Sequence, residues 1–355
     1  MIGVFRNEAD DRKQLKFMGS AKDLMTPDGK RRIMPTDMML HHQDMTMILK
    51  DANNPHSLYS LDLPTGKVVE EWKIDDSTEI TSFVPKTKFA QMNPEATFIG
   101  TSHNSLYTVD PRISGNKRVN NQTRSYKTKV DFACAVTTES GQVAIGSHTG
   151  DIRLYDAVIG RNAKTALLKL KDPVRGVDTT KNGHYMIATC PTYLWFVNLV
   201  IETEGARKGF TGFERSFPAD DRPDGFRVEL KHEHRAMIYD MGIPISFRRA
   251  TFNYGPDSLE NTVVTSMGPF LFAFNVRKLK LRQVEYTMKR YEEDVVGDGF
   301  KWDTDREIVV TMASDVVMER KNKLAKPNRA SFMGTEFSGA SQFGGIVQEH
   351  GQGHY

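Results

Sequence analysis

The stretch "VAIGSHTGDIRLYD" (143–156) decides the fold, because closely related phrases recur along the chain. It joins two short apolar segments through a turn that contains Gly150, and the second segment ends in Asp156. The related phrases are "FIGTSHNSLYTVD" (98–110), "MIATCPTYLWFVN" (186–198) and "VVTSMGPFLFAFN" (263–275). No reactive residue recurs with them, so the repeat indicates architecture rather than chemistry.

The spacing of the phrases identifies the architecture. The last residue of the aligned strand falls at positions 6, 62, 110, 156, 198, 275 and 320, so the steps are 56, 48, 46, 42, 77 and 45 residues. A period of about 40–45 residues with several short strands per unit is typical of a WD-repeat β-propeller. A β-sandwich also has short strands and polar turns, but it does not require this locked register.

Two further positions repeat with the strands. In five of the seven units the strand before the aligned one carries a small residue: Gly100, Gly146, Ala188, Thr265 and Thr311. Five of the aligned strands end in a short polar residue, at the position where a WD repeat has the Asp of its Trp-Asp pair: Asp62, Asp110, Asp156, Asn198 and Asn275. We interpret both sets as structural positions of the repeat.

The aligned strands predict seven blades, one of them incomplete, with six blades as the alternative. The first aligned strand starts at residue 2, which leaves no room for the two inner strands of its blade. The tail ("QFGGIVQ", 342–348), a partner or sequence lost by truncation would supply those strands. An open strand edge attracts other strands, so our hypothesis is that another chain pairs with it.

The domain boundaries follow from the same alignment. The propeller is predicted over residues 1–321, with an insertion within 199–260 that accounts for the long step. In this insertion "HEHRAMIYDMG" (232–242) predicts a short helix closed by Gly242. Residues 322–355 are predicted to form a flexible tail, first basic and then rich in Gly and Ser.

Composition narrows the functional classes. The chain has 48 basic and 45 acidic residues among 355, a balance too even to favour nucleic acid as a partner. It has no apolar run near 18 residues and no signal peptide, which argues against a transmembrane segment. Cys134 and Cys190 are expected to be buried free thiols, which suits the cytoplasm.

Motifs for catalysis, metals and cofactors are missing from the sequence, so no enzyme, cofactor or metal site is predicted. His41 and His42 are adjacent, beside Asp44, and would point to opposite faces of a strand. His232 and His234 lack a visible third ligand. A last acidic group is better explained by turn chemistry than by calcium: Asp303, Asp305 and Glu307.

Two basic features remain as interaction candidates. "NVRKLKLRQ" (275–283) is interpreted as an outer strand that places three cations on one face: Lys278, Lys280 and Arg282. Exposed lysines often only protect such an edge. "ERKNKLAKPNR" (319–329) is interpreted as a flexible segment that attracts acidic protein tails or anionic lipid, through Arg320, Lys321, Lys323, Lys326 and Arg329. Nothing else supports a peripheral membrane contact.

Several stretches have details that the repeat does not demand, such as "DPRISGNK" (110–117) and "NAKTALLKLKDPVRGVD" (162–178). With "FERSFPAD" (213–220) and "MKRYEEDVVGDGFKWDTDREIVVTM" (288–312), they resemble the C-terminal propeller domain of the vacuolar import and degradation protein 27 family. The resemblance covers almost all of residues 2–320 and implies a cytoplasmic interaction module in trafficking or protein turnover, without known catalysis. The N-terminal half usual in that family has no counterpart here.

These observations favour a non-catalytic propeller scaffold that binds other proteins within a complex. The first alternative is a structural subunit of a large assembly, cytoskeletal or ciliary. A propeller hydrolase is a more distant alternative, since it would require ionisable residues converging at one end of the channel.

Overall fold

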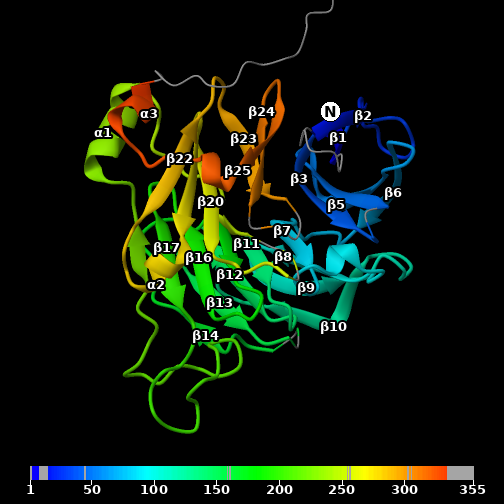
Figure 1. Ribbon diagram of the computed structural model, residues 1–355. Coiled ribbons are helices and arrows are strands. Elements are labelled where there is room, and N and C mark those ends of the chain that lie inside the picture. The colour runs from blue at the N-terminus through cyan, green and yellow to red at the C-terminus, as the bar shows by residue number, and fades with distance from the viewer. Residues whose placement is uncertain are drawn as a thin grey trace, which may run out of the picture.

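The computed structural model describes residues 2–7, 15–43, 45–157, 159, 161–253, 255, 257–301, 304 and 306–333. Over these residues the strands form five sheets of four strands, one of three and one of two. The six larger sheets follow one another around an axis as blades (Figure 1). The predicted all-β propeller is confirmed.

Each blade is antiparallel, and its first strand lies nearest the axis. The first blade contains β3 (Pro35–His41), β4 (Thr46–Asp51), β5 (Asn54–Asp62) and β6 (Lys67–Lys73). The second contains β7 (Ser82–Pro85), β8 (Phe98–Ser102), β9 (Ser105–Val109) and β10 (Arg118–Ser125), with a 3-10 turn, η1 (Ala90–Met92), between β7 and β8. The third contains β11 (Phe132–Thr137), β12 (Val143–Ser147), β13 (Ile152–Tyr155) and β14 (Thr165–Ala166).

The other three blades follow the same order. The fourth contains β15 (Gly176–Thr179), β16 (Tyr185–Thr189), β17 (Leu194–Asn198) and β18 (Phe226–Val228). The fifth contains β19 (Thr251–Phe252), β20 (Thr262–Met267), β21 (Phe270–Asn275) and β22 (Tyr286–Arg290). The sixth contains β23 (Val295–Phe300), β24 (Glu307–Met312) and β25 (Val316–Arg320).

The repeat alignment agrees with this topology. Ser60, Thr108 and Leu154 lie in β5, β9 and β13, which are the third strands of three successive blades. The small residues lie in second strands as predicted, and at the glycines neighbouring side chains leave no room for a Cβ atom. At Gly100, for example, a Cβ atom would come within 2.5 Å of the ring of Tyr107 on the paired strand β9.

Apolar side chains fill the space between each blade and the next. Between the first and second blades, the rings of Trp72 and Phe98 lie 6.2 Å apart within a buried cluster. Similar clusters join the second blade to the third, the third to the fourth, the fourth to the fifth and the fifth to the sixth. The core is therefore a series of interfaces between sheets, as a propeller requires.

A separate two-stranded sheet, β1 (Ile2–Asn7) and β2 (Leu15–Ala21), adjoins the first blade. Ile2 and Ala21 pack against Leu49 and Leu61, on the side of the first blade that faces away from the second. This sheet holds the first aligned strand and is the incomplete unit that the sequence predicted. The six blades match the count of the predicted alternative.

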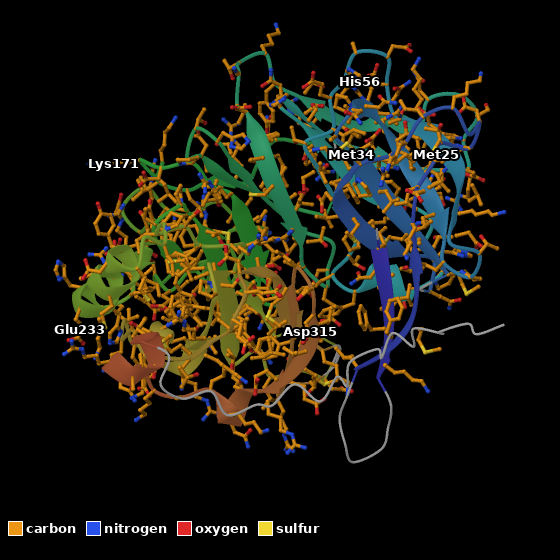
Figure 2. All side chains as sticks on the ribbon, turned by 90° about the horizontal axis from the view of Figure 1, so that it is seen from above. Met25, Met34, His56, Lys171, Glu233 and Asp315 are labelled. Atoms are coloured by element: carbon orange, nitrogen blue, oxygen red, sulfur yellow. The ribbon has the colours of Figure 1, made fainter. Side chains whose placement is uncertain are left out.

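Apolar side chains remain exposed around the two-stranded sheet and on the blades beside it: Val4, Phe5, Phe17, Met18, Met25, Met34, Met38 and Val296. Figure 2 labels Met25 and Met34 near one another on the side of the blue first blade, and Asp315 on the orange sixth blade. In the described part of the chain, β1 pairs only with β2. We call this region the open seam. That another chain pairs with it stays a prediction.

The insertion within 199–260 contains the outer strand β18 and the helix α1 (His232–Asp240). Gly242 follows this helix with a φ of 73°, in the left-handed region that glycine tolerates. The helix predicted over 232–242 is confirmed. His234 on this helix is buried against Tyr286 and the ring of Phe332.

The prediction that a flexible tail begins at residue 322 is wrong for residues 322–333. This stretch contains the end of η2 (Lys321–Lys323), two backbone hydrogen bonds between Ala325 and Met288 on β22, and α3 (Arg329–Met333). Leu324 and Phe332 are buried and hold the stretch against the fifth and sixth blades. Only these two apolar residues anchor a stretch that is otherwise rich in cations, so its composition did not indicate that it is ordered. Residues 334–355, including "QFGGIVQ" (342–348), lie outside the described residues.

Candidate functional site

The polar residues that end the aligned strands act as turn-forming groups. The Oδ2 atom of Asp62 accepts a hydrogen bond from the backbone N–H of Thr65 at 3.0 Å. Asn198 accepts from the backbone N–H of Val200 at 3.1 Å. Equivalent bonds from the following loop reach Asp110 and Asn275, and Asp156 forms an ion pair with Lys164. These short side chains bind backbone N–H groups, or at Asp156 a lysine, of the loop that follows the third strand. This shared role explains why short polar residues recur at the position.

The strand predicted over 275–283 is wrong, because these residues form a helix, α2 (Val276–Lys280). The side chain of Asn275 caps it, and the outer strand of this blade is β22 instead. The three cations do not share one face. Lys280 lies 4.1 Å from the centre of the Tyr185 ring, Lys278 pairs with Glu285, and Arg282 pairs with Asp224.

The second basic feature is exposed and ordered. We call residues 320–329, "RKNKLAKPNR", the basic segment. Four of its cations are exposed and form no ion pair with a carboxylate in the described part of the chain: Arg320, Lys323, Lys326 and Arg329. Lys321 instead donates to the side chains of Asn261 and Thr262.

The histidine candidates have structural roles. His41 is buried with its Nε2 atom 3.0 Å from the carbonyl oxygen of Ala96. His42 is exposed, but it lies in the turn after β3 with a φ of 54° and not on the strand, so the predicted alternation of faces does not apply to it. Burial lowers the pKa of His41 and of His234. No group of three possible metal ligands occurs among the described residues. Asp44, Asp303 and Asp305 lie outside that set.

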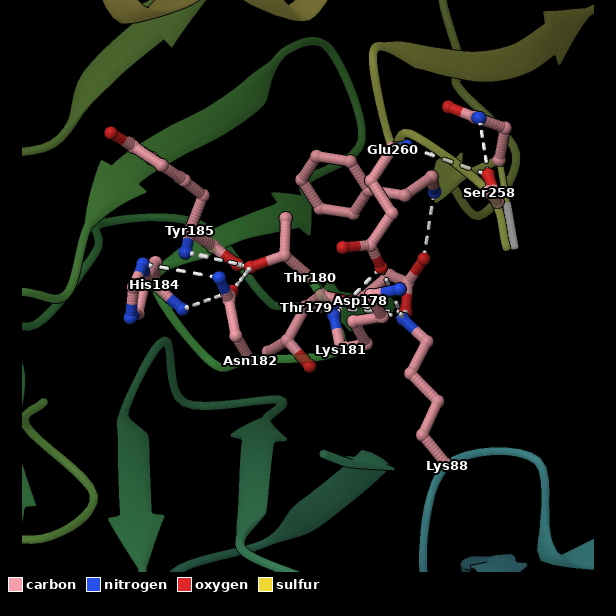
Figure 3. Close-up of polar contacts among 12 residues, drawn as sticks. Lys88, Asp178, Thr179, Thr180, Lys181, Asn182, His184, Tyr185, Ser258 and Glu260 are labelled. Carbon is pink, nitrogen blue, oxygen red and sulfur yellow. Dashed lines mark hydrogen bonds and ion pairs between the residues drawn. The ribbon is translucent and has the colours of Figure 1, made fainter. Parts of the chain in front are cut away.

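The structure also brings together a buried charge cluster that sequence reasoning missed (Figure 3). Lys88 follows β7, Asp178 lies in β15 and Glu260 precedes β20, so three blades contribute. The Nζ atom of Lys88 lies 3.1 Å from Oδ1 of Asp178 and 3.9 Å from Oε1 of Glu260. All three side chains are less than a tenth exposed, at 9%, 8% and 8%.

Backbone groups complete this cluster. Asp178 accepts from the N–H of Phe252 at 2.7 Å, and Glu260 accepts from the N–H of Lys181 at 2.7 Å. Burial raises the pKa of Glu260 to about 7, against the opposing effect of Lys88. Lys88 thus lies within ion-pair distance of both carboxyl groups, and Glu260 is partly protonated near neutral pH. Lys88, Asp178 and Glu260 are far apart in the sequence, and none of them belongs to a recognisable motif, so the sequence did not indicate that they form a cluster.

A cavity of about 180 Å³ adjoins the cluster and is lined by Val84, Phe89, Lys88, Asp178 and Arg249, among others. Its charged groups already bind one another or backbone carbonyls: Lys88 binds Asp178, and Arg249 donates to the carbonyl of Val177 at 3.1 Å. We therefore interpret the cluster as a structural connection between blades.

A larger groove of about 470 Å³ lies among the fourth, fifth and sixth blades. Its polar lining comes from Arg175, Ser246, Arg248 and Asp294, and we call it the arginine groove. Arg175 immediately precedes β15, Arg248 closely precedes β19, and Asp294 immediately precedes β23. These are the residues that lead into the inner strands of three consecutive blades, so they share one end of the channel. No sequence motif marked the two arginines.

The fold and these surfaces define a WD-like propeller domain. The model of the VID27 C-terminal WD40-like domain matches residues 1–338, and the chain belongs to this family. "Vacuolar import and degradation protein 27" of Schizosaccharomyces pombe is 43% identical over 332 residues, which cover 93% of this chain and 41% of that protein. The Saccharomyces cerevisiae protein of the same name is 35% identical over 338 residues, covering 94% and 43%.

The chain spans about two-fifths of the length of these curated relatives. Among solved structures, a chain in "Crystal Structure of Mitotic Checkpoint Complex" is similar with a TM-score of 0.55 and 11% identity, covering 87% of this chain and 82% of that one. This likeness concerns the fold alone. Within the described residues, every helix is too short or too polar to cross a lipid bilayer.

Proposed function

We propose that this propeller is a non-catalytic scaffold that binds acidic surfaces of other proteins in the cytoplasm, in a process of protein turnover or trafficking. The names of the curated relatives support the link to turnover. Two buried free thiols, Cys134 and Cys190, suit a reducing compartment.

The basic segment carries this proposal. Its four exposed cations lie on a stretch that buried side chains anchor at Leu324 and Phe332. The backbone of Phe332 is also held by a hydrogen bond from Arg290 at 2.6 Å. Cations on an ordered backbone lose less conformational freedom on binding than cations on a mobile tail, so more of the attraction appears as affinity.

The same charges favour a partner with an acidic surface. The basic segment contains five cations and no carboxylate in ten residues. Opposite charges at an interface speed association and select the partner, and their effect falls as salt rises. A partner held this way is expected to dissociate more readily in high salt.

The test compares two variants that remove equal charge from different surfaces. The first replaces all four exposed cations of the basic segment with Glu: Arg320, Lys323, Lys326 and Arg329. The control replaces four exposed cations elsewhere with Glu: Lys127, Lys129, Lys171 and Arg222. Both are expressed in the source cells and analysed by quantitative cross-linking mass spectrometry.

We expect proteins cross-linked to the wild type to be retained by the control and lost by the basic-segment variant, at equal thermal stability of the two. Cross-links should map to the basic segment. Equal cross-linking of all three proteins would contradict the proposal, as would a wild type that runs as a free monomer at about 0.15 M salt.

A further inference from the structure

The arginine groove presents two guanidinium groups that the fold holds in place without neutralising them. Arg175 donates from Nη1 to the Oγ atom of Ser246 at 3.2 Å, and Arg248 donates from Nη1 to the carbonyl oxygen of Val296 at 2.7 Å. Both side chains are exposed, and neither forms an ion pair with a carboxylate of the described residues. A guanidinium has five N–H donors, so each arginine keeps several for a ligand.

Backbone contacts fix the positions of both arginines. The N–H of Arg175 donates to the carbonyl of Thr189 at 2.8 Å, and the N–H of Arg248 donates to the carbonyl of Ser266 at 2.9 Å. The carbonyl of Arg248 accepts from the hydroxyl of Thr265 at 2.7 Å. Each arginine is thus attached to a second strand of its blade, and the groove is largely preformed.

Two carboxyl groups lie near the arginines, and in the described part of the chain neither lies within ion-pair distance of them. Asp298 is half-buried on β23 and does not line the groove; its Oδ2 atom accepts from the Ser266 hydroxyl at 2.6 Å. Burial raises the pKa of Asp298 to about 6, so it is mostly ionised at neutral pH. Asp294 lines the groove and is exposed to solvent. Of the residues that line the groove, two are cations, Arg175 and Arg248, and one, Asp294, is a carboxylate.

The rest of the groove wall is apolar, built by Ile243, Pro244, Phe247 and Val295. Gly268 completes the wall with a φ of 51°, and a Cβ atom there would come within 2.8 Å of Ile243. The volume of the arginine groove, about 470 Å³, falls within the range of about 300–1,000 Å³ that is usual for pockets that bind small ligands or a few side chains. Apolar walls between fixed cations suit a short segment that combines apolar and acidic side chains.

We propose that the arginine groove binds a short linear segment of a partner protein in which acidic residues flank an apolar residue. The carboxylates bind Arg175 and Arg248, and the apolar side chain lies against Ile243 and Phe247. This inference rests on the proposed function as a protein-binding scaffold and assigns it a second surface, lined by residues outside the basic segment.

The experiment measures fluorescence anisotropy with the whole chain and a fluorescein-labelled nonapeptide of alternating Glu and Leu. A peptide of alternating Gln and Leu is the uncharged control, and one of alternating Glu and Gly lacks the apolar side chains. The protein variants are Arg175→Gln and Arg248→Gln. The matched controls are Lys323→Gln and Lys326→Gln, which remove one cation each from the basic segment.

We expect the Glu–Leu peptide to bind, and each groove variant to weaken it at least about tenfold, which is the usual loss for one charge-assisted hydrogen bond. The basic-segment controls should bind as the wild type does, and both control peptides should bind more weakly. Because Arg248 also contacts the backbone of Val296, Arg248→Lys is added and should restore part of the affinity if folding is intact.

The inference is overturned if the Glu–Leu peptide does not bind, or binds the groove variants and the wild type equally. If instead only Lys323→Gln and Lys326→Gln weaken binding, the basic segment is the acidic-ligand surface, and the proposed function stands without the groove. Loss of cross-linked partners in the basic-segment variant, with no peptide bound in the groove, separates failure of this inference from failure of the proposed function.

Discussion

Replacing Glu260 with Gln should remove a pH-dependent loss of stability from this propeller. Glu260 is 8% exposed in the buried cluster, and burial raises its pKa from the ordinary 4.5 to about 7. Below pH 4.5 both the folded and the unfolded chain carry the proton, so Glu260 adds no pH dependence there. Between these two pKa values only the folded chain keeps it, so rising pH favours unfolding.

The size of this effect follows from the pKa difference. A difference of one pKa unit corresponds to about 1.4 kcal/mol, so Glu260 should lower the free energy of unfolding by about 3 kcal/mol between pH 4.5 and pH 7, with no further loss above. Gln keeps an oxygen for the hydrogen bond from Lys181 and has no proton to lose. The difference in stability between Glu260→Gln and the wild type should therefore grow in favour of the variant as pH rises.

Urea unfolding at equilibrium, followed by tryptophan fluorescence at several pH values between about 4.5 and 8, measures this difference directly. Subtracting wild type from variant cancels the contributions of Asp298, His41 and other groups whose pKa values also shift. A difference that stays constant with pH would refute the buried, partly protonated Glu260. A difference that falls as pH rises would show that the ion pair with Lys88 outweighs burial.

Three further substitutions test the packing of the fold by urea unfolding. Lys88→Met leaves Asp178 buried without its cation and should cost about 3–5 kcal/mol; a cost below about 1 kcal/mol would contradict a role in joining the blades. Phe332→Ala should cost about 3–5 kcal/mol, because its ring is fully buried; an unchanged midpoint would mean that residues 322–333 are not anchored. Asp298→Asn should raise stability above pH 6, where wild-type Asp298 loses its proton, and equal curves at pH 8 would contradict that.

The sequence predicted the propeller because packing between blades requires similar residues at the same positions of each repeat. Third strands need apolar side chains on both faces and a polar residue such as Asp62 at the end, while second strands need a small residue where a ring covers them. These demands recur at the same few positions of each blade, so a single sequence reveals them. The buried thiols and the helix before Gly242 were predicted for the same local reasons.

The surfaces were predicted less well because they depend on contacts between distant segments. The apolar residues Val276 and Leu279 stand three apart and are buried in α2, yet the alternating cations around them also fit a strand. The anchoring of the basic segment depends on Phe332 meeting Phe270, 5.5 Å away between ring centres, which no local pattern shows. Arg175 and Arg248 come together only because corresponding positions of successive blades meet at the channel.

The open seam shows that the fold can be stabilised by the interfaces between blades even though the ring is not closed by strand pairing at that point. Each blade from the first to the fifth has a buried apolar interface with the next, so the cost of unfolding is distributed over those five interfaces. The two-stranded sheet adds one more interface, to Leu49 and Leu61, while Phe17 and Val296 remain exposed, at 57% and 43%. Exposed apolar side chains beside an open strand edge are unfavourable in water, but here they do not interrupt the series of packed blades. The ring can therefore hold the basic segment and the arginine groove in place whether or not another strand pairs with β1.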